Sequence, residues 1–308
     1  MIMLARTVLL QLANNKTMEA FVKRNPLSGR MTKRFIVGES VEEILPAVRE
    51  MNAQGAAVSL DFLGESVTTE EEVAETLDVY LRLLAAIKRD NLKSAISVKL
   101  TALGLDIDPD FCVRNMERLL AAAGKEIFVQ MDMEGTPYTE RTLGIVYRLW
   151  DAPNSLKNGG AVIQSYLYRS EKDIETLIEK GIRVRLCKGA YKEAADVAFP
   201  EKEKVDANYS LLMKRLLEHG NYPGIATHDP AIIAEAKRFV TEKGISKDRF
   251  EFQMLYGIRR DLQTELIKDG YNLTIYTPFG THWFPYFMRR LAERPANLWF
   301  VAKNMLRG

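Results

Sequence analysis

Residues 161–188 read AVIQSYLYRSEKDIETLIEKGIRVRLCK. Two short apolar or β-branched runs, 161–166 and 183–188, flank an amphipathic stretch from Asp173 to Lys180 that stops at Gly181. A glycine directly after a helical pattern is a common C-terminal stop, because it adopts the left-handed conformation without strain. The stretch therefore predicts a strand, a helix and a second strand, which is a right-handed βαβ unit with a parallel strand pair.

The same alternation extends in both directions along the chain. Further short apolar runs, each ending in turn residues or polar groups, occupy residues 57–62, 95–100, 127–132, 224–228, 250–255 and 273–277. Thr69 followed by three glutamates predicts one helix start, and Asp229-Pro230 predicts another, with Asp as the cap and Pro in the first turn. About eight strand–helix units are the number that closes a parallel (βα)8 TIM-like barrel, an α/β fold.

A doubly wound open sheet is the main rival fold. Such a sheet usually carries a glycine-rich first turn for a dinucleotide, and the chain has neither G-x-G-x-x-G nor G-x-x-x-x-G-K-[ST]. Gly159-Gly160 precedes a strand and is interpreted as a turn. No linker divides the sequence, so residues 1–308 are expected to form one domain. Residues 1–35 are expected to add an N-terminal helical extension, since Leu9, Leu10 and Leu12 recur at helical spacing.

Bulk composition excludes several classes of protein. The 308 residues carry a formal net charge of only +2, which argues against a nucleic-acid partner held by bulk electrostatics. The two cysteines, Cys112 and Cys187, are far apart, so a reducing compartment is expected, with Cys187 a buried apolar residue. No run of about 18 apolar residues occurs, and the N-terminus does not resemble a secretory signal. A cytoplasmic location is therefore expected.

Polar side chains stand near the end of almost every expected strand. In a parallel barrel these ends meet at one face, where reactive groups gather, so the pattern predicts one shared polar site. A simpler interpretation remains open, namely that the strand ends are polar only because solvent covers this end of a barrel. The strand-end residues are Asp61, Lys99, Asp132, Gln164, Arg185, Lys188, His228, Gln253 and Tyr276.

The residue types at these ends limit the chemistry. Only three histidines occur in the chain, so a metal hydrolase site with several His ligands is not expected. Lys99 and Lys188 would suit a Schiff-base aldolase. A flavin is equally compatible, because Arg185 and Lys99 could stabilise negative charge on its reduced ring and Gln164 could bind its polar edge. These residues alone do not choose between the two.

The last amphipathic helix concentrates charge. Tyr286 lies three and four residues before Arg289 and Arg290, and Glu293 follows Arg289 by four, so these side chains neighbour one another. A solvated, salt-bridged helix face is the ordinary interpretation. Apolar flanks favour a helix that faces a cavity, where paired guanidinium groups could bind a small anion; they are Trp283, Phe284, Phe287 and Met288. Pro295 should kink or end the helix.

Three motifs together resemble the proline dehydrogenase family. They are FEFQMLYG at 250–257, RLCKGAY at 185–191, and Tyr286-x-x-Arg289-Arg290-x-x-Glu293. The resemblance runs from about the first strand to the C-terminus, and the length is similar to that of monofunctional bacterial members. It implies a distorted (βα)8 barrel with FAD bound at the carboxyl ends of the strands.

The resemblance also implies roles for individual residues. Arg289 and Arg290 would bind the proline carboxylate with Lys99, and Glu293 would orient an arginine. Tyr276, Leu255 and Tyr286 would wall the proline ring, and no residue is assigned as a catalytic acid or base. The implied FAD contacts are Asp132, Gln164, Arg185, Cys187, Lys188, Gly189, Ala190, Tyr191, Lys202, Thr227, His228 and Gln253. Two departures from the family pattern are Cys187 in place of Val and Lys192 in place of Trp, the second of which could change loop mobility over the FAD.

The implied reaction is oxidation of L-proline to Δ1-pyrroline-5-carboxylate by hydride transfer to flavin N5. Electrons would pass to a quinone, which implies a peripheral contact with the inner face of the cell membrane. A separate pyrroline-5-carboxylate dehydrogenase would act next in the pathway. A barrel that binds proline without redox chemistry is the remaining non-enzymatic alternative.

Overall fold

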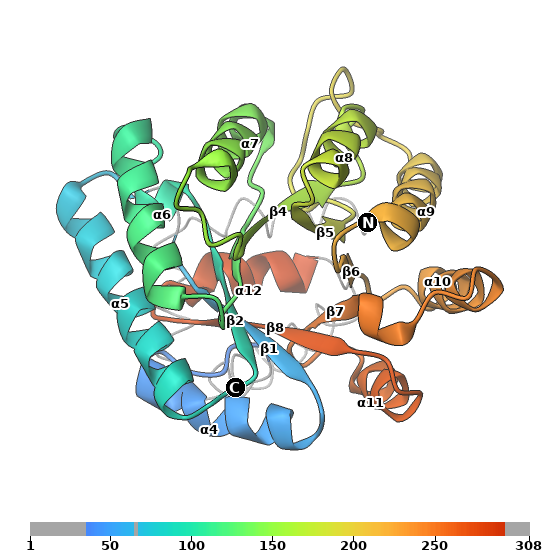
Figure 1. The fold of residues 1–308 in the computed structure, drawn as a ribbon, viewed down its shortest axis with the longest axis horizontal. Coiled ribbons are helices and arrows are strands. Elements are labelled where there is room, and N and C mark those ends of the chain that lie inside the picture. Colours follow the sequence, from blue (N-terminus) through green and yellow to red (C-terminus); the bar gives the residue numbers. More distant parts are fainter. Residues whose placement is uncertain (1–34, 65–66, 293–308) are drawn as a thin grey trace, which may run out of the picture.

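The computed structural model describes residues 35–64 and 67–292. Eight parallel strands close into a single barrel and follow one another around it in chain order (Figure 1). Closure is made by β1 and β8, where Ser59 pairs with Tyr276. The strands are β1 (Ala57–Phe62), β2 (Ser94–Val98), β3 (Val129–Met131), β4 (Gly159–Gln164), β5 (Arg183–Cys187), β6 (Gly224–Ala226), β7 (Glu251–Leu255) and β8 (Leu273–Phe279). The predicted (βα)8 fold class is confirmed.

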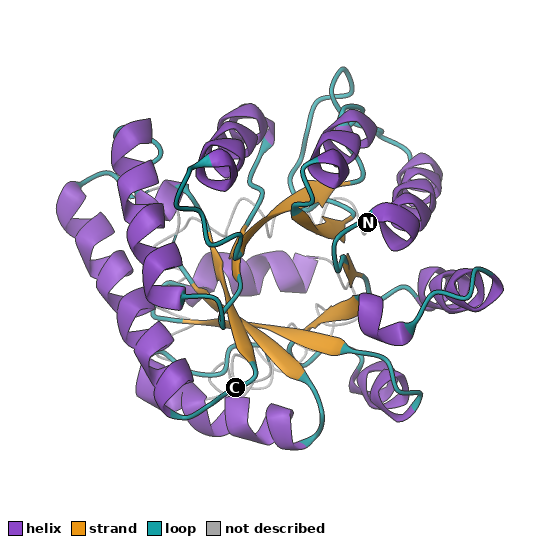
Figure 2. Ribbon diagram, viewed as in Figure 1, coloured by secondary structure: helices purple, strands orange, loops and turns teal. Residues whose placement is uncertain are grey.

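Helices surround the strands as an outer ring, which Figure 2 shows in purple around the orange barrel. They are α4 (Val41–Ala53), α5 (Glu70–Arg89), α6 (Pro109–Ala123), α7 (Thr136–Asp151), α8 (Ser170–Glu179), α9 (Lys202–His219), α10 (Pro230–Glu242) and α11 (Arg260–Lys268), with short 3-10 turns at Thr101–Leu103 and Lys247–Arg249. A further helix, α12 (Trp283–Ala292), does not belong to this ring. The expected N-terminal helical extension lies outside the described residues, apart from Phe35.

Two of the predicted helix starts are confirmed by their caps. The Thr69 hydroxyl accepts from the Glu72 amide, and the Glu72 carboxylate accepts in return from the Thr69 amide, which completes a capping box before α5. Asp229 caps α10 by accepting from the Ala231 amide. The third helix begins earlier than predicted: α8 starts at Ser170 instead of Asp173, and it ends at Glu179 just before Gly181. Its first turn has no side-chain cap, so the sequence carries no local signal for that start.

Gly159 and Gly160 were interpreted as a turn, and this is wrong. Both belong to β4, where Gly160 pairs with Gln130 of β3 and Arg183 of β5. A Cβ on Gly160 would lie 2.4 Å from the Phe128 ring and 2.5 Å from the Arg183 carbonyl oxygen. The glycine is needed because neighbouring groups approach the strand closely, which is a tertiary requirement that a local pattern does not reveal.

The strands present two different faces. Residues such as Val58, Leu60, Ile96 and Val98 are buried in the main hydrophobic core with the surrounding helices. The alternate residues point into the barrel, and many are polar or charged; they include Ser59, Asp61, Ser97, Gln130, Asp132, Arg185, Glu251, Gln253 and Thr274. Barrel interiors are usually filled by branched apolar side chains, so this polar interior is the first structural sign of a functional site.

In Figure 1, helix α12 lies across the middle of the barrel, inside the ring that the other helices form. Trp283, Phe284, Phe287 and Met288 are buried in a second, smaller apolar cluster that also includes Phe35 and Ile258. The prediction that this helix packs on its apolar flanks is therefore confirmed. Among the described residues, no helix is both long enough and apolar enough to cross a bilayer.

Candidate active site

A cavity of about 460 Å³ opens at the carboxyl ends of the barrel strands. Its volume falls in the range of small-molecule and cofactor sites, roughly 300–1,000 Å³. Strand ends, the loops that follow them and α12 all contribute to its lining. The polar face predicted from the strand ends therefore surrounds one cavity.

Most of the predicted site residues line this cavity. From the expected substrate group these are Lys99, Leu255, Tyr276, Tyr286 and Arg290, and from the expected cofactor group Asp132, Gln164, Arg185, Cys187, Lys188, Gly189, Ala190, Tyr191, Thr227, His228 and Gln253. Lys202 is the first residue of α9 and does not belong to the lining. The side chain of Arg289 and all of Glu293 lie outside the described part of the structure.

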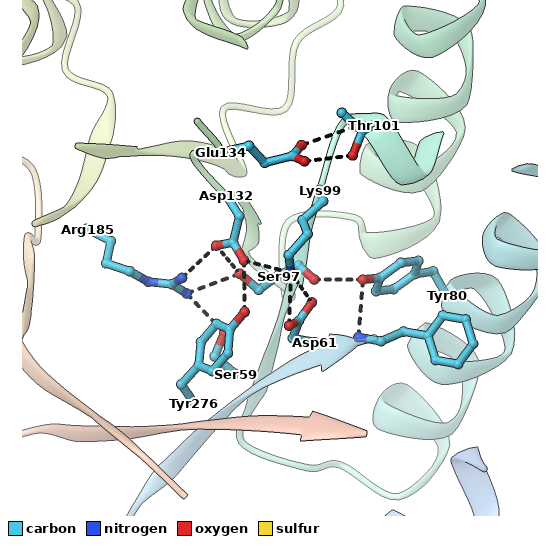
Figure 3. A network of polar contacts seen from close by, with 11 residues as sticks. Ser59, Asp61, Tyr80, Ser97, Lys99, Thr101, Asp132, Glu134, Arg185 and Tyr276 are labelled. Carbon is cyan, nitrogen blue, oxygen red and sulfur yellow. Dashed lines mark hydrogen bonds and ion pairs between the residues drawn. The ribbon is translucent and has the colours of Figure 1, made fainter. Parts of the chain in front are cut away.

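Lys99 is held between two buried carboxylates at the centre of the mouth (Figure 3). Its Nζ lies 3.0 Å from both oxygens of Asp61 and 3.6 Å from Oδ2 of Asp132. The Tyr276 hydroxyl donates to the same Oδ2 at 2.8 Å. Burial raises the pKa of Asp61, against the opposing effect of Lys99. Together these residues form a compact charge cluster on β1, β8 and the ends of β2 and β3.

Arg185 links this cluster to the interior of the barrel. Its Nη1 donates to Oδ1 of Asp132 at 2.7 Å, and its Nη2 donates to the hydroxyls of Ser97 and Ser59 at 3.2 and 3.3 Å. Burial alone would raise the pKa of Asp132, but Arg185 and then Lys99 outweigh it, so the pKa is lowered. Asp132 is therefore a carboxylate at neutral pH. The guanidinium plane lies over the Tyr276 ring, 4.9 Å from its centre.

Below Arg185, a chain of hydrogen bonds continues toward the floor of the barrel. Arg185 Nε donates to Oε1 of Gln253 at 2.6 Å, and Nε2 of Gln253 donates to Glu251 at 2.5 Å. Glu251 also accepts from Thr274 at 2.8 Å and pairs with Arg183 at 2.7 Å. Because Glu251 and Arg185 bind opposite ends of the Gln253 amide, they define its orientation.

Lys188 stands at another part of the rim. Its Nζ lies 2.5 Å from Oδ1 of Asp206 and 3.0 Å from Oδ2 of Asp229, and Lys202 pairs with the other oxygen of Asp206. Lys202 is therefore linked to the cavity wall through two ion pairs, from Lys202 to Asp206 and from Asp206 to Lys188. Schiff-base lysines are activated in an apolar pocket or beside another cation, whereas the groups beside Lys188 are carboxylates. Lys99 and Lys188 are both held in this way, which disfavours the aldolase alternative.

The remaining polar lining groups have defined orientations. The Leu255 amide donates to Nε2 of His228 at 2.8 Å, so this ring nitrogen carries no proton. Nε2 of Gln164 donates to the carbonyl oxygen of Glu134 at 3.0 Å. The Glu134 carboxylate turns to the Thr101 hydroxyl, 2.7 Å away, as Figure 3 shows. Glu134 and Asp132 therefore have different partners and do not form a carboxylate pair.

Helix α12 contributes an aromatic and a cationic group to the lining. Tyr286 is buried, and the Arg290 guanidinium lies over its ring, 5.3 Å from the centre. Leu255 packs against the same apolar cluster. Tyr286 of α12 and Leu255 of β7 thus belong to one apolar cluster, and Arg290 lies beside Tyr286.

Several lining residues were not assigned a role from the sequence. Asp61 was recognised only as a strand-end residue, and Asp229 only as a helix cap. The apolar lining residues Met133, Val162, Ala226 and Met254 carried no signal of their own. Ser59 and Ser97 lie two residues before Asp61 and Lys99, so strand alternation could have placed them on the same inner face.

Metal and thiol chemistry receive no support from the described residues. Among these, no three His, Cys, Asp or Glu side chains gather in a way that could hold a metal ion. Cys112 is buried and Cys187 is half-buried, and burial raises the pKa of each thiol to about 12. A thiol that remains protonated at neutral pH is a poor nucleophile, so the interpretation of Cys187 as a small apolar residue is retained.

Comparison with known proteins identifies relatives over most of the chain. The family model for proline dehydrogenase matches residues 44–303. Proline dehydrogenase 2 of Bacillus subtilis is 44% identical over 273 residues, which cover 88% of this chain and 89% of that protein. Proline dehydrogenase of Deinococcus radiodurans is 42% identical over 283 residues, which cover 90% and 91%.

A solved structure with the same barrel is proline utilization A of Bdellovibrio bacteriovorus, inactivated by N-propargylglycine. It superimposes with a TM-score of 0.81 at 28% sequence identity. The match covers 89% of this chain but 33% of that one, so the common part is one portion of a longer polypeptide.

Proposed function

The chain belongs to the proline dehydrogenase family and oxidises proline in proline catabolism; we propose that it does so with FAD bound in the barrel cavity. The proposed product is Δ1-pyrroline-5-carboxylate, and a quinone is the proposed electron acceptor. The observation that carries the proposal is the convergence of Lys99, Tyr276, Tyr286 and Arg290 on one cavity. Three separate sequence motifs contribute residues to that same cavity.

The cavity lining fits a flavin. Asp132, Gln164, Arg185 and Gln253 provide charged and amide groups at the polar centre of the mouth. Gln164 would present its amide to a ligand edge, with Nε2 bound to the Glu134 carbonyl oxygen and Oε1 as the acceptor. Met133, Val162 and Met254 supply apolar surface beside these groups. This mixture suits a flat ring system with one polar edge.

Gly189 adds a close backbone approach at the rim. Its φ is +112°, a conformation open to glycine, and it lies in the wall of the cavity. Lys188 and the amides that follow it would bind the phosphates, and His228 and Thr227 would contact the rest of the cofactor. FAD, when bound, would supply the acceptor for the electrons that leave proline.

The substrate region is proposed at the α12 side of the cavity. Arg290, with Arg289, would bind the proline carboxylate, because paired guanidinium groups match the geometry of a carboxylate. Lys99 would approach the same anion from the end of β2, and Glu293 would orient an arginine. Tyr276, Tyr286 and Leu255 would enclose the ring of the substrate and exclude water from it. Positioning of this kind supplies a large part of the rate acceleration.

Asp61 and Asp132 would restrain the Lys99 ammonium by charge and hydrogen bonding. No described residue stands out as a base for the substrate amine, and we propose that solvent receives that proton. Electron transfer to a quinone implies a peripheral contact with the membrane, and a separate dehydrogenase would consume the product.

A spectrum with a proline titration tests the proposal. The purified protein should be yellow or should become so when FAD is added, and L-proline should bleach the flavin bands without oxygen. A colourless protein that FAD cannot reconstitute would contradict it. Binding of proline with no spectral change would instead support a non-catalytic barrel, and borohydride trapping of Lys99 or Lys188 would support an aldolase.

Arg289→Met separates substrate binding from a structural role of α12. We expect a large loss of proline affinity with FAD still bound. Unfolding of this variant would instead favour the interpretation that Arg289 stabilises α12 through a salt bridge and does not bind substrate.

A further inference from the structure

The loop between β5 and α9, residues 188–201, forms one wall of the cavity. Lys188, Gly189, Ala190 and Tyr191 line the cavity directly. The loop leaves the barrel and rises beside α8 before it reaches α9 (Figure 1). A long excursion of this kind needs contacts outside its own strand and helix to keep its lining residues in place.

Residues 165–168 hold both ends of the loop through backbone hydrogen bonds. At the first end, the Tyr166 amide donates to the Lys188 carbonyl at 3.0 Å. At the far end, the Phe199 amide donates to the Tyr166 carbonyl at 2.7 Å, and Leu167 pairs with Ala198 in an antiparallel bridge. The loop is therefore closed against the segment that follows β4.

The ring of Tyr166 lies directly under Gly189. A Cβ on Gly189 would come within 2.6 Å of two ring carbons, so only a bare backbone fits there. The phenol hydroxyl at the far end of that ring donates to Oε1 of Glu193 at 3.3 Å. Tyr166 thus contacts both the lining part of the loop and its middle.

Glu193 connects the middle of the loop to a different helix. The same Oε1 accepts from the Thr136 amide at 2.8 Å. Thr136 is the first residue of α7, and Gly135, its N-cap, has no side chain to cap the helix. Glu193 therefore acts as the N-terminal cap of α7 from a position 57 residues away in the chain. A carboxylate at this place is stabilised both by the hydrogen bond and by the helix dipole.

We propose that Glu193 is a positioning residue for cofactor retention. By capping α7 and binding Tyr166, it holds residues 188–191 against the cavity and slows the release of the bound cofactor. The contact requires the loop to span the space from β5 to the start of α7, which lies after β3. The inference rests on the proposed FAD site, but the clamp itself is a property of the protein alone.

Three variants and one control test this role. Glu193→Ala removes the cap, Glu193→Gln keeps an oxygen but loses the charge, and Tyr166→Phe removes only the phenol hydroxyl. Asp196→Ala deletes an exposed carboxylate from the same loop and is the matched control. Hydrogen–deuterium exchange of the apoprotein should show faster exchange at residues 188–199 and at the Thr136 amide in Glu193→Ala, with the barrel strands unchanged.

Retention of the cofactor is then measured by flavin fluorescence after dilution of the holoenzyme. We expect FAD dissociation to be about tenfold faster in Glu193→Ala, in line with the loss of a helix cap. Smaller increases are expected for Glu193→Gln and Tyr166→Phe, and wild-type behaviour is expected for Asp196→Ala. With saturating FAD, kcat per bound flavin should stay close to that of the wild type.

Unchanged FAD release in Glu193→Ala would overturn the proposal. Faster exchange throughout the barrel would also overturn it, because Glu193 would then support the fold and not the loop. If the wild-type protein bound no FAD, the proposed cofactor would be wrong, while the exchange experiment would still report whether Glu193 clamps the loop.

Discussion

Arg185 of β5 and Asp132 at the end of β3 form a buried ion pair, with Nη1 2.7 Å from Oδ1. Both residues are almost fully buried and both line the cavity. A buried ion pair is weak evidence for stability, because desolvation offsets much of the attraction. The pair instead orients both side chains at the cavity wall, so the position of each side chain depends on the presence of the other.

Removal of Asp132 should strongly destabilise the protein. In Asp132→Ala, Arg185 loses its carboxylate, and the hydroxyls of Tyr276 and Ser97 lose an acceptor. We expect the free energy of unfolding of the apoprotein in urea to fall by about 3–5 kcal/mol, as is typical when one partner of a buried pair is deleted. The control Asp151→Ala breaks a partly exposed pair with Lys180 and should change it by less than about 1 kcal/mol. Equal effects in the two variants would contradict the importance of burial.

Substrate binding should depend on the guanidinium of Arg290. In Arg290→Met, the cation that lies over Tyr286 is lost from the cavity wall. We expect KM for proline to rise roughly 10- to 100-fold, the loss typical for hydrogen bonds to a charged group, with FAD binding retained. Arg215→Met removes an arginine from an exposed pair with Glu175 on α8, and its steady-state kinetics should match those of the wild type. An unchanged KM in Arg290→Met would remove this residue from the substrate site.

Two glycine substitutions should change the free energy of unfolding in opposite directions. Gly160→Ala places a methyl group within 2.5 Å of both the Phe128 ring and the Arg183 carbonyl oxygen. The crowding should lower the free energy of unfolding by about 1–3 kcal/mol. Gly144→Ala, on the exposed face of α7, meets nothing within 4 Å and should stabilise the protein by about 0.5–1 kcal/mol, the difference in helix propensity. Thermal unfolding of both variants distinguishes the two, and destabilisation by Gly144→Ala would contradict this account.

Acid should weaken the contact between α4 and α5 through Asp90. Hydrogen bonds from Arg89 and Arg49 lower the pKa of Asp90 from 3.8 to about 2. The folded protein therefore binds this proton less readily than the unfolded chain does. The stability that Asp90 contributes is fully present well above pH 3.8 and is lost as the pH falls from there toward about 2.

Asp90→Asn provides the measurement. The difference in urea midpoint between wild type and variant should be constant above about pH 5 and should shrink as the pH falls toward 2, since the carboxylate is then protonated in both states. Low ionic strength is needed because the pair is exposed to salt screening. A difference that does not vary with pH would show that Asp90 acts without its charge.

The fold was predictable because its signal is repeated. Each βα unit carries its own apolar run, its own amphipathic stretch and its own turn residues. A wrong prediction for one unit therefore does not affect the predictions for the others. Capping at Thr69 and Asp229 was likewise local, and both caps are present. The predictions for the start of α8 and for Gly160 were wrong. Helix α8 begins without a side-chain cap. Gly160 is required by contacts with Phe128 and Arg183, which are distant in the chain.

The membership of the site was predictable to a large extent, but its connections were not. Strand ends must meet at one face of a barrel, and this placed Lys99, Asp132 and Tyr276 together. The pairing of Lys99 with Asp61, and of Arg185 with Asp132 and Gln253, depends on side-chain directions inside the closed barrel. Strand alternation places Glu251 on the same face as Gln253, but its partners Arg183 and Thr274 come from other strands and were not predictable.

The sequence by itself determined the order and number of the βα units, the family resemblance and most of the residues around the cavity, because these follow from short-range periodicity and from motifs. Only the tertiary structure decided which charges neutralise one another and which segments hold the cavity wall. Parallel pairing of β1 with β2 and of β2 with β3 brings Asp61, Lys99 and Asp132 within ion-pair distance. The loop between β5 and α9 brings Glu193 to the start of α7, which follows β3. Such contacts join residues that are far apart in the chain, so their geometry exists only once the barrel has closed.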